Sequence, residues 1–212
     1  MTIGELAYKI NESNWLENGI KANLFIVKMQ GWSRDMYFSD TKLDWISPSP
    51  NITDNNSAIL YSGICLFEAT NISEGRGTDL PFQIIGSPWL NSSKIVSMLN
   101  SKKIDGVNFS TISFKPKSII GKSTNPKYLN KDCNGIKISI VDKRKIKPIE
   151  VALHLLNAIK KEDLKEFKIT SPNFFDKLYG SDKLRICIES NSDVNLLIDN
   201  WVNYDDGKFL LY

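Results

Sequence analysis

Two charged residues, Glu74 and Arg76, stand beside glycines in the stretch ATNISEGRGTDLPFQIIGSPW, residues 69–89. A carboxylate and a guanidinium at this spacing form either a salt-bridged structural loop or a site that grips a polar ligand. Gly75 and Gly77 fit both interpretations, because glycine lets the backbone approach a ligand closely and also supplies the positive φ of a tight turn. The residues of this stretch alone leave both alternatives open.

Polar and aromatic residues in the first third of the chain have the chemistry of a carbohydrate site. Sugar hydroxyls bond to Asp, Asn and Arg side chains, and the apolar C–H faces of a sugar stack on aromatic rings. The mixture therefore suits a sugar ligand, although the tryptophans taken alone favour core packing. The residues concerned are Trp32, Arg34, Asp35, Trp45, Ser49, Asn51, Glu68 and Asn71.

Metal and nucleophile chemistry is not indicated. The one histidine, His154, lies on an apolar helix pattern, which predicts a packed side chain at the edge of the core rather than a ligand or base. Cys65, Cys133 and Cys187 are odd in number and embedded in apolar surroundings, which predicts buried free thiols. The GKST run has Pro116 where a phosphate-binding loop needs glycine. We expect no metal and no organic cofactor.

Composition predicts a globular protein with no nucleic-acid partner. The chain has 212 residues, 42% hydrophobic and 24% charged, and its formal net charge of +3 is small and dispersed. The densest basic run, DKRKIKP at 142–148, is interpreted as a solvated connection. The sequence shows neither a membrane-spanning run nor an export signal, so we expect no membrane partner and, as the chain is written, a cytoplasmic location.

The residue patterns predict an α/β part, residues 1–80, followed by an α+β part, residues 81–212. A capping box formed by Thr2 and Glu5 begins a helix that ends near Asn18. The elements expected after it are a buried parallel strand at 22–29, a structured surface loop at 30–57, a buried strand or short helix at 58–67, helices at 91–103, 148–161 and 194–202, strands at 107–114 and 135–142, and an ambiguous segment at 184–188.

Several longer stretches resemble the NamZ-type exo-β-N-acetylmuramidases of bacterial cell-wall turnover. They are MTIGELA, GWSRDMYF, LDWISPSPN, YSGICLFEATNISEGRGTDLPFQIIGSPW and the terminal FLLY, dense up to residue 89 and sparser beyond it. The resemblance implies the C-terminal remnant of a Rossmann-like catalytic domain followed by a smaller α+β auxiliary domain. The implied activity is release of N-acetylmuramic acid from the non-reducing ends of peptidoglycan fragments.

The resemblance also implies the site residues, because the motif matching SEGRGT lines the pocket between the two domains of that family. Glu74 becomes the candidate catalytic residue. An arginine is a natural partner for the lactyl carboxylate of N-acetylmuramic acid. The candidate substrate-binding residues are Arg76, Arg34, Asn51, Trp32 and Asn71.

One departure from the family is large: members are about twice as long, and MTIGELA matches a segment near their middle. We therefore expect the chain to lack most of the Rossmann-like half, including the earlier carboxylate usually proposed for catalysis, and to be inactive without a companion N-terminal half. Family members are also often exported. The alternatives are a non-catalytic module that binds peptidoglycan fragments or a partner protein, and a decaying remnant.

Overall fold

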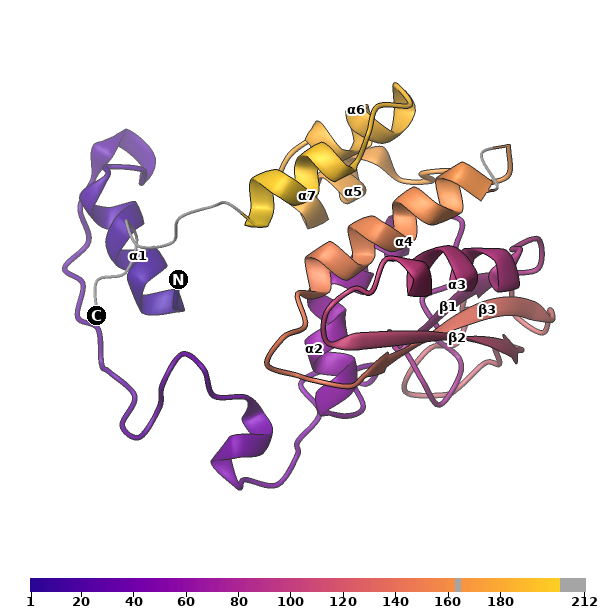
Figure 1. Cartoon of the computed structure of the whole chain (residues 1–212). Helices are drawn as coiled ribbons and strands as arrows, with labels where there is room; N and C mark the ends of the chain where they lie inside the picture. Colours follow the sequence, from indigo (N-terminus) through magenta and orange to yellow (C-terminus); the bar gives the residue numbers. More distant parts are fainter. Residues whose placement is uncertain (163–164, 203–212) are drawn as a thin grey trace.

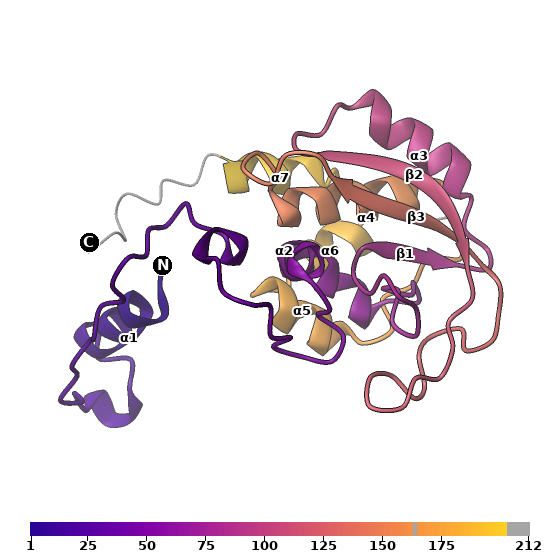
Figure 2. The same cartoon turned by 90° about the horizontal axis from the view of Figure 1, so that it is seen from below.

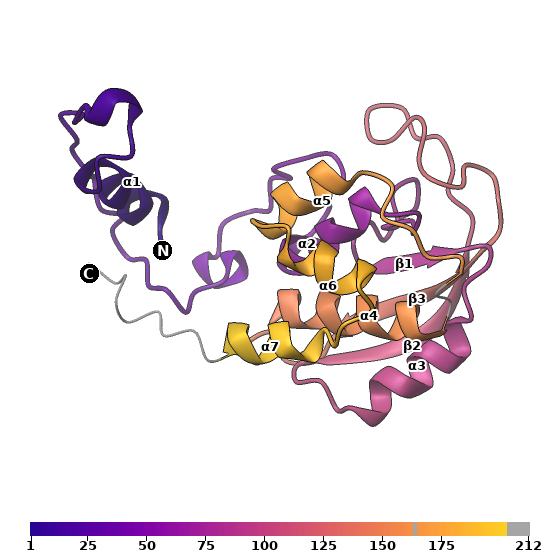
Figure 3. The ribbon, with the colours of Figure 1, turned by 90° about the horizontal axis from the view of Figure 1, so that it is seen from above.

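The chain divides into an N-terminal arm and a packed body. The structure, a computed structural model, describes residues 1–162 and 165–202. The arm, residues 1–50, extends away from the body, residues 51–202, in all three views (Figure 1, Figure 2 and Figure 3). Glu5 and Asn11 are the only buried residues of the arm, so few internal contacts hold it.

Helix α1 (Ile3–Glu12) opens the arm, as its capping signal predicts. Thr2 Oγ1 accepts a hydrogen bond from the Glu5 backbone N–H, and the Glu5 carboxylate accepts one from the Thr2 backbone N–H. The helix ends before its predicted end, which falls in the short 3-10 helix η1 (Glu17–Gly19). Its large apolar side chains are not packed into a core, since Ile3 is 88% and Leu6 is 43% exposed.

The predicted buried strand at residues 22–29 is wrong. The segment has no regular secondary structure, and Phe25, Val27 and Met29 are 82%, 94% and 71% exposed. A strand needs hydrogen bonds to a neighbouring strand, and the described residues place none beside this segment. The Rossmann-like remnant expected from this segment is therefore not confirmed.

The aromatic loop that follows lies on the surface, as expected, and contains the 3-10 helix η2 (Phe38–Thr41). It is tied to the body through the basic run. Lys143 Nζ lies 2.6 Å from Asp40 Oδ1, and Arg144 Nη2 lies 3.8 Å from Asp40 Oδ2. The run predicted as a solvated connection therefore anchors the arm to the body.

A three-stranded antiparallel sheet forms one layer of the body. Its order is β1 (Ile84–Ser87), β3 (Cys133–Ile140) and β2 (Val107–Phe114). The central strand pairs Ile136 with Ile85 of β1. The predicted strands at 107–114 and 135–142 correspond to β2 and β3, with β3 shifted by two residues toward the N-terminus.

Helices cover this sheet. They are α2 (Asn55–Ile64), the 3-10 helix η3 (Cys65–Ala69), α3 (Ser92–Ser101), α4 (Pro148–Glu162), α5 (Pro172–Tyr179), α6 (Lys183–Glu189) and α7 (Asn195–Val202). Helix α4 packs against α2, α3 and α7, and Figure 1 shows α5, α6 and α7 on the side of α4 away from the sheet. The helices predicted at 91–103, 148–161 and 194–202 are confirmed, and the segments at 58–67 and 184–188 are helical.

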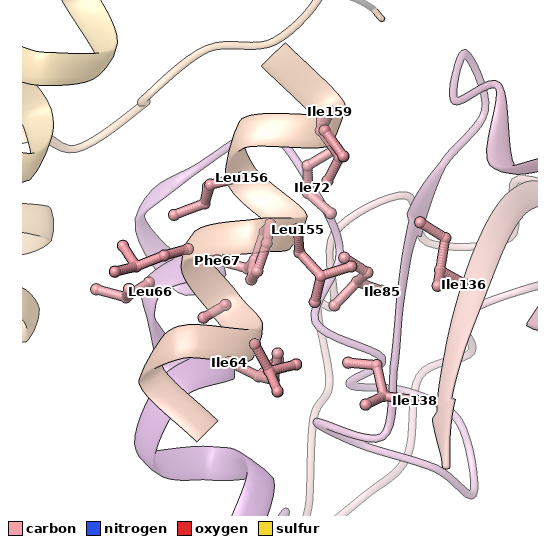
Figure 4. Close-up of a cluster of buried hydrophobic side chains, with 14 of the residues drawn as sticks. Ile64, Leu66, Phe67, Ile72, Ile85, Ile136, Ile138, Leu155, Leu156 and Ile159 are labelled. Carbon is pink, nitrogen blue, oxygen red and sulfur yellow. The ribbon is translucent and has the colours of Figure 1, made fainter. Parts of the chain in front are cut away.

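One hydrophobic core joins η3, α4 and the sheet. Figure 4 shows Phe67, Leu155, Ile85 and Ile136 in a continuous cluster, and each of these side chains is fully buried. Burying one such side chain contributes about 1.5–3 kcal/mol to folding. The core therefore fixes η3 against β1, and the loop between these two elements carries Glu74. The core also contains residues from both sides of the domain boundary expected at residue 80. That boundary stays a prediction.

Candidate functional site

The loop that carries Glu74 and Arg76 is fixed to the sheet at both ends. Ser73 and Gly86 exchange two backbone hydrogen bonds, of 2.8 and 3.0 Å. The backbone then turns back on itself, because the Phe82 N–H donates to the Glu74 carbonyl at 2.8 Å. The charged side chains of the loop are therefore presented from a backbone with little freedom.

Gly75 and Gly77 make this turn possible. Each has a φ of +81°, in the left-handed region that side chains disfavour. A Cβ atom on Gly75 would lie 2.8 Å from the Leu80 carbonyl oxygen, and one on Gly77 would lie 2.6 Å from the Lys117 carbonyl oxygen. Of the two interpretations that the sequence left open for the glycines, the tight turn is confirmed.

Four charged side chains, Glu68, Glu74, Arg76 and Lys127, form what we call the charge cluster. Arg76 Nη2 lies 2.8 Å from Glu68 Oε2, and Arg76 Nε lies 3.6 Å from Glu74 Oε1. Lys127 Nζ lies 3.0 Å from Glu74 Oε2. Glu74 and Arg76 thus belong to a network of two carboxylates and two cations rather than to an isolated pair.

Lys127 is the member of the charge cluster that no sequence pattern identified. It comes from the long loop between β2 and β3, and its Nζ donates to the carbonyls of Phe67 at 2.7 Å and Ile72 at 2.9 Å as well as to Glu74. These acceptors can satisfy all three ammonium protons. Burial lowers the pKa of Lys127, although the Glu74 carboxylate acts in the opposite direction. No local motif could reveal it, since its partners are 53 to 60 residues away in sequence.

The charge cluster opens to solvent at Arg76. The Arg76 side chain is 34% exposed, against 13% for Glu68 and 5% for Glu74. Its guanidinium carbon lies 5.4 Å from the centre of the Phe82 ring, and its Nε finds no hydrogen-bond partner among the described residues. Burial raises the pKa of Glu68, and Arg76 partly offsets this rise. A guanidinium that is about one-third exposed is suited to a carboxylate ligand.

Asn71 and Asn51 brace loops of the body. Asn71 Nδ2 donates to the Glu166 carbonyl at 2.7 Å, and its Oδ1 accepts from the Lys168 N–H at 2.8 Å. Asn51 Nδ2 donates to the Lys122 carbonyl at 3.1 Å. These contacts give both amides a structural role, and substrate binding by either residue stays a prediction.

Trp32 and Arg34 lie on the arm, away from the charge cluster. Arg34 pairs with the buried Glu5 of α1, and Trp32 is 39% exposed. No contact within the described part of the chain joins either residue to Glu74 or Arg76. Trp32 and Arg34 can bind a substrate together with the charge cluster only if contacts beyond those of the described residues hold the arm against it.

His154 lies on α4 at the edge of the core, as predicted. Its side chain is 12% exposed, with Nδ1 3.3 Å from Lys102 Nζ and Nε2 3.7 Å from Glu150 Oε1. Burial, reinforced by the charge of Lys102, lowers the pKa of His154 to about 4. The imidazole is therefore neutral at physiological pH. Its contacts, with Lys102 and Glu150, do not include a member of the charge cluster.

Among the described residues, the three cysteines form no disulfide. Cys65 and Cys133 are free and buried, as predicted, while Cys187 is free and half-buried. Residues 1–162 and 165–202 hold no group of three His, Cys, Asp or Glu side chains that could bind a metal ion, and within them no helix has the length and apolar character to cross a bilayer. Cavities of about 380 and 610 Å³, lined by residues such as Lys160 and Asn100, lie elsewhere in the body.

Two family models place the chain in a family of glycosidases. The family model described as exo-β-N-acetylmuramidase NamZ, C-terminal, matches residues 59–206, and the N-terminal model of the same family matches residues 1–56. The chain therefore belongs to the NamZ exo-β-N-acetylmuramidase family, and the resemblance seen in its sequence is confirmed.

Individual relatives agree with this assignment. The peptidoglycan β-N-acetylmuramidase NamZ of Bacillus subtilis (strain 168) is 37% identical over 95% of this chain, which covers 46% of that protein. Two crystal structures of DUF1343 family proteins from Bacteroides fragilis NCTC 9343 have the same fold, with TM-scores of 0.83 and 0.67 and identities of 26% and 30%. The matches cover 99% and 100% of this chain. They cover 55% of the chain in each of the two crystal structures. This chain thus spans about half the length of these relatives.

Replacing Lys127 tests how strongly the charge cluster is held. Lys127→Met leaves Glu74 buried beside an apolar side chain and frees two carbonyls, so we expect the free energy of unfolding to fall by about 3 kcal/mol. Chemical denaturation measures this change. Lys122→Met, an exposed lysine of the same loop, should change stability by less than about 0.5 kcal/mol. Equal effects of the two substitutions would contradict the network.

His154 should make stability depend on pH. Its pKa is about 4 in the folded chain against an ordinary 6.5, so the unfolded chain takes up the proton first as pH falls. The stability that the neutral imidazole contributes is fully present above pH 6.5. As the pH falls toward 4, the free energy of unfolding decreases by about 3 kcal/mol in all. Denaturation of the wild type and His154→Gln at both ends of this range should show a smaller loss in the variant. Parallel losses would show that His154 titrates normally in the folded chain.

Proposed function

We propose that this chain forms part of an exo-β-N-acetylmuramidase that releases N-acetylmuramic acid from the non-reducing ends of peptidoglycan fragments. The observation that carries the proposal is the charge cluster, built on the SEGRGT loop inside the segment that matches the NamZ C-terminal model. The peptidoglycan β-N-acetylmuramidase activity of the Bacillus subtilis relative supports the same substrate class.

The charge cluster has suitable chemistry for this substrate. The exposed edge of Arg76 can pair with the lactyl carboxylate, which distinguishes N-acetylmuramic acid from other amino sugars of the cell wall. Glu74, held by Lys127 and beside Arg76, supplies a fixed negative charge that can stabilise the positive charge of an oxocarbenium-like transition state. Glu74 is thus the proposed catalytic residue and Arg76 the proposed substrate-binding residue.

The second part of the proposal is a companion polypeptide that supplies the rest of the N-terminal domain. Large apolar side chains are exposed all along the arm, whereas soluble monomers rarely leave so much apolar surface uncovered. These side chains, between 62% and 94% exposed, are Ile3, Trp15, Ile20, Phe25, Val27, Met29, Leu43 and Ile46.

The segment at 22–29 is suited to pairing with a strand of that companion. Phe25, Val27 and Met29 alternate along it and share one exposed face, while Ile26 packs toward Gly4 of α1. Within the described residues, positions 23–27 form no backbone-to-backbone hydrogen bond. An extended segment with free backbone groups and one apolar face can join the edge of a sheet. The match of residues 1–56 to the NamZ N-terminal model supports the rest of that domain as the partner.

Activity should require both polypeptides. We expect the chain alone to release no N-acetylmuramic acid from muropeptides, and the chain co-expressed with the rest of the N-terminal domain to release it. Glu74→Gln should lower the rate by roughly 100-fold or more because the fixed charge is lost. Glu162→Gln is the control, since this carboxylate is as buried as Glu68 and pairs with Lys94 at 2.6 Å.

Assembly is tested separately from turnover. Val27→Asp should prevent co-purification of the two polypeptides, whereas Val141→Asp, at an exposed site on the body, should not. A folded assembly that releases no sugar contradicts the muramidase proposal. Binding of muropeptides by the chain, without turnover even in the assembly, would instead favour the non-catalytic module.

A further inference from the structure

A cavity of about 380 Å³ is lined by helix α4 and by the turn that joins α6 to α7. Figure 1 places α6 and α7 on the side of α4 away from the sheet, and the cavity shares no lining residue with the charge cluster. One water molecule takes up about 30 Å³ of liquid, so the cavity has room for a larger ligand. Its lining residues are Asn157, Lys160, Lys161, Asn191, Ser192 and Asp193.

Lys160 is a buried cation that lacks an anionic partner. The residue is 3% exposed, and within residues 1–162 and 165–202 it forms no ion pair. Its Nζ donates to the Cys187 carbonyl at 3.4 Å, which engages one of the three ammonium protons. A buried charge without a counter-ion is unfavourable, and burial accordingly lowers the pKa of Lys160. An anion in the cavity would remove this penalty.

Asn157 is a second buried polar side chain on the same wall. It is 4% exposed and precedes Lys160 by three positions, so the two side chains share one face of α4. Its amide finds no hydrogen-bond partner in the part of the chain that the structure describes. Since buried polar groups are normally paired, this amide needs a partner from within the cavity.

The opposite wall does not neutralise Lys160. Asp193 is the carboxylate of this wall, and it accepts hydrogen bonds from the Asn195 N–H at 3.0 Å and from Asn195 Nδ2 at 2.8 Å. Lys161 adds a second positive charge to the lining. With two ammonium groups against one carboxylate that already has donors, the cavity favours a negatively charged ligand.

We propose that this cavity binds a small oxyanion, a carboxylate or a phosphate, with Lys160 as the countercharge and Asn157 as an amide donor. The site lies apart from the charge cluster and is independent of the proposed muramidase function. Lactate and inorganic phosphate are the probes that distinguish the two anion classes.

Thermal unfolding of the full chain tests the proposal. Lactate or phosphate is added at low millimolar concentration, with the ionic strength held constant by sodium chloride. An anion that binds only the folded chain raises Tm as its concentration rises. Lys160→Met should lower the affinity by roughly tenfold or more, because the countercharge is lost. Lys177→Met, at an exposed lysine of α5, should keep the wild-type response.

The Lys160→Met variant should remain folded, because it replaces an unpaired buried charge with an apolar side chain of similar length. Asn157→Leu provides a second variant, which should also weaken the response. An equal rise of Tm in the wild type and Lys160→Met would overturn the proposal, since it would reflect a general salt effect. No rise with either probe would overturn it as well and would leave the cavity to water.

NMR of the full chain locates the anion. The backbone amide signals of Asn191, Ser192 and Asp193 should shift as the probe is added. The Cε signal of Lys160, assigned from Lys160→Met, should titrate at a higher pH with the anion present, because a negative charge favours the ammonium form. Shifts with lactate alone would assign a carboxylate site, and shifts with phosphate alone a phosphate site. Binding that leaves all these signals unchanged would contradict the proposal.

Discussion

The ion pair between Lys127 and Glu74 is the interaction on which the rest of the site depends. A carboxylate that is 5% exposed needs a countercharge, because an unpaired charge in a protein interior costs several kcal/mol. Lys127 supplies this charge and at the same time binds carbonyls of Phe67 and Ile72. It therefore ties the end of η3, the turn at Gly75 and the loop between β2 and β3 into one unit.

A second constraint acts on the arm. Many of its large apolar side chains are exposed to solvent, whereas the core of the body is closed by η3, α4 and the sheet. The body is thus complete as a packing unit, and the arm is not. Contacts of Asp35 and Asp40 with Lys143 and Arg144 attach the arm to the body and leave Val27 exposed. A site formed between arm and body must therefore be assembled from more than these residues.

Sequence reasoning succeeded where the determining interactions are local. The capping box of Thr2 and Glu5 involves residues three positions apart, and it is present. The alternation of β2 and β3 was also readable, because one face of each strand packs on the core. The strand expected at 22–29 failed because apolar residues become a strand only where a neighbour accepts their hydrogen bonds.

The candidate site was predictable in part for the same reason. Glu74 and Arg76 are close in sequence, and their family motif singled them out. Lys127 was not identifiable, since the loop that carries it approaches Glu74 only after the sheet has formed. Glu68 was visible as a polar residue, but its contrast with Glu74 depends on burial and on which cation each carboxylate meets. Such contrasts are properties of the folded chain.

The central claim is that Arg76 in the charge cluster recognises the lactyl carboxylate of N-acetylmuramic acid. The most direct measurement is calorimetric binding of N-acetylmuramic acid and N-acetylglucosamine, which lacks the lactyl group, to the assembled protein and to its Arg76→Gln variant. We expect the wild type to bind N-acetylmuramic acid at least roughly tenfold more tightly, a difference of about 1.4 kcal/mol, and the variant to lose this preference. Equal affinities in the wild type, or a preference that survives the substitution, would contradict the account.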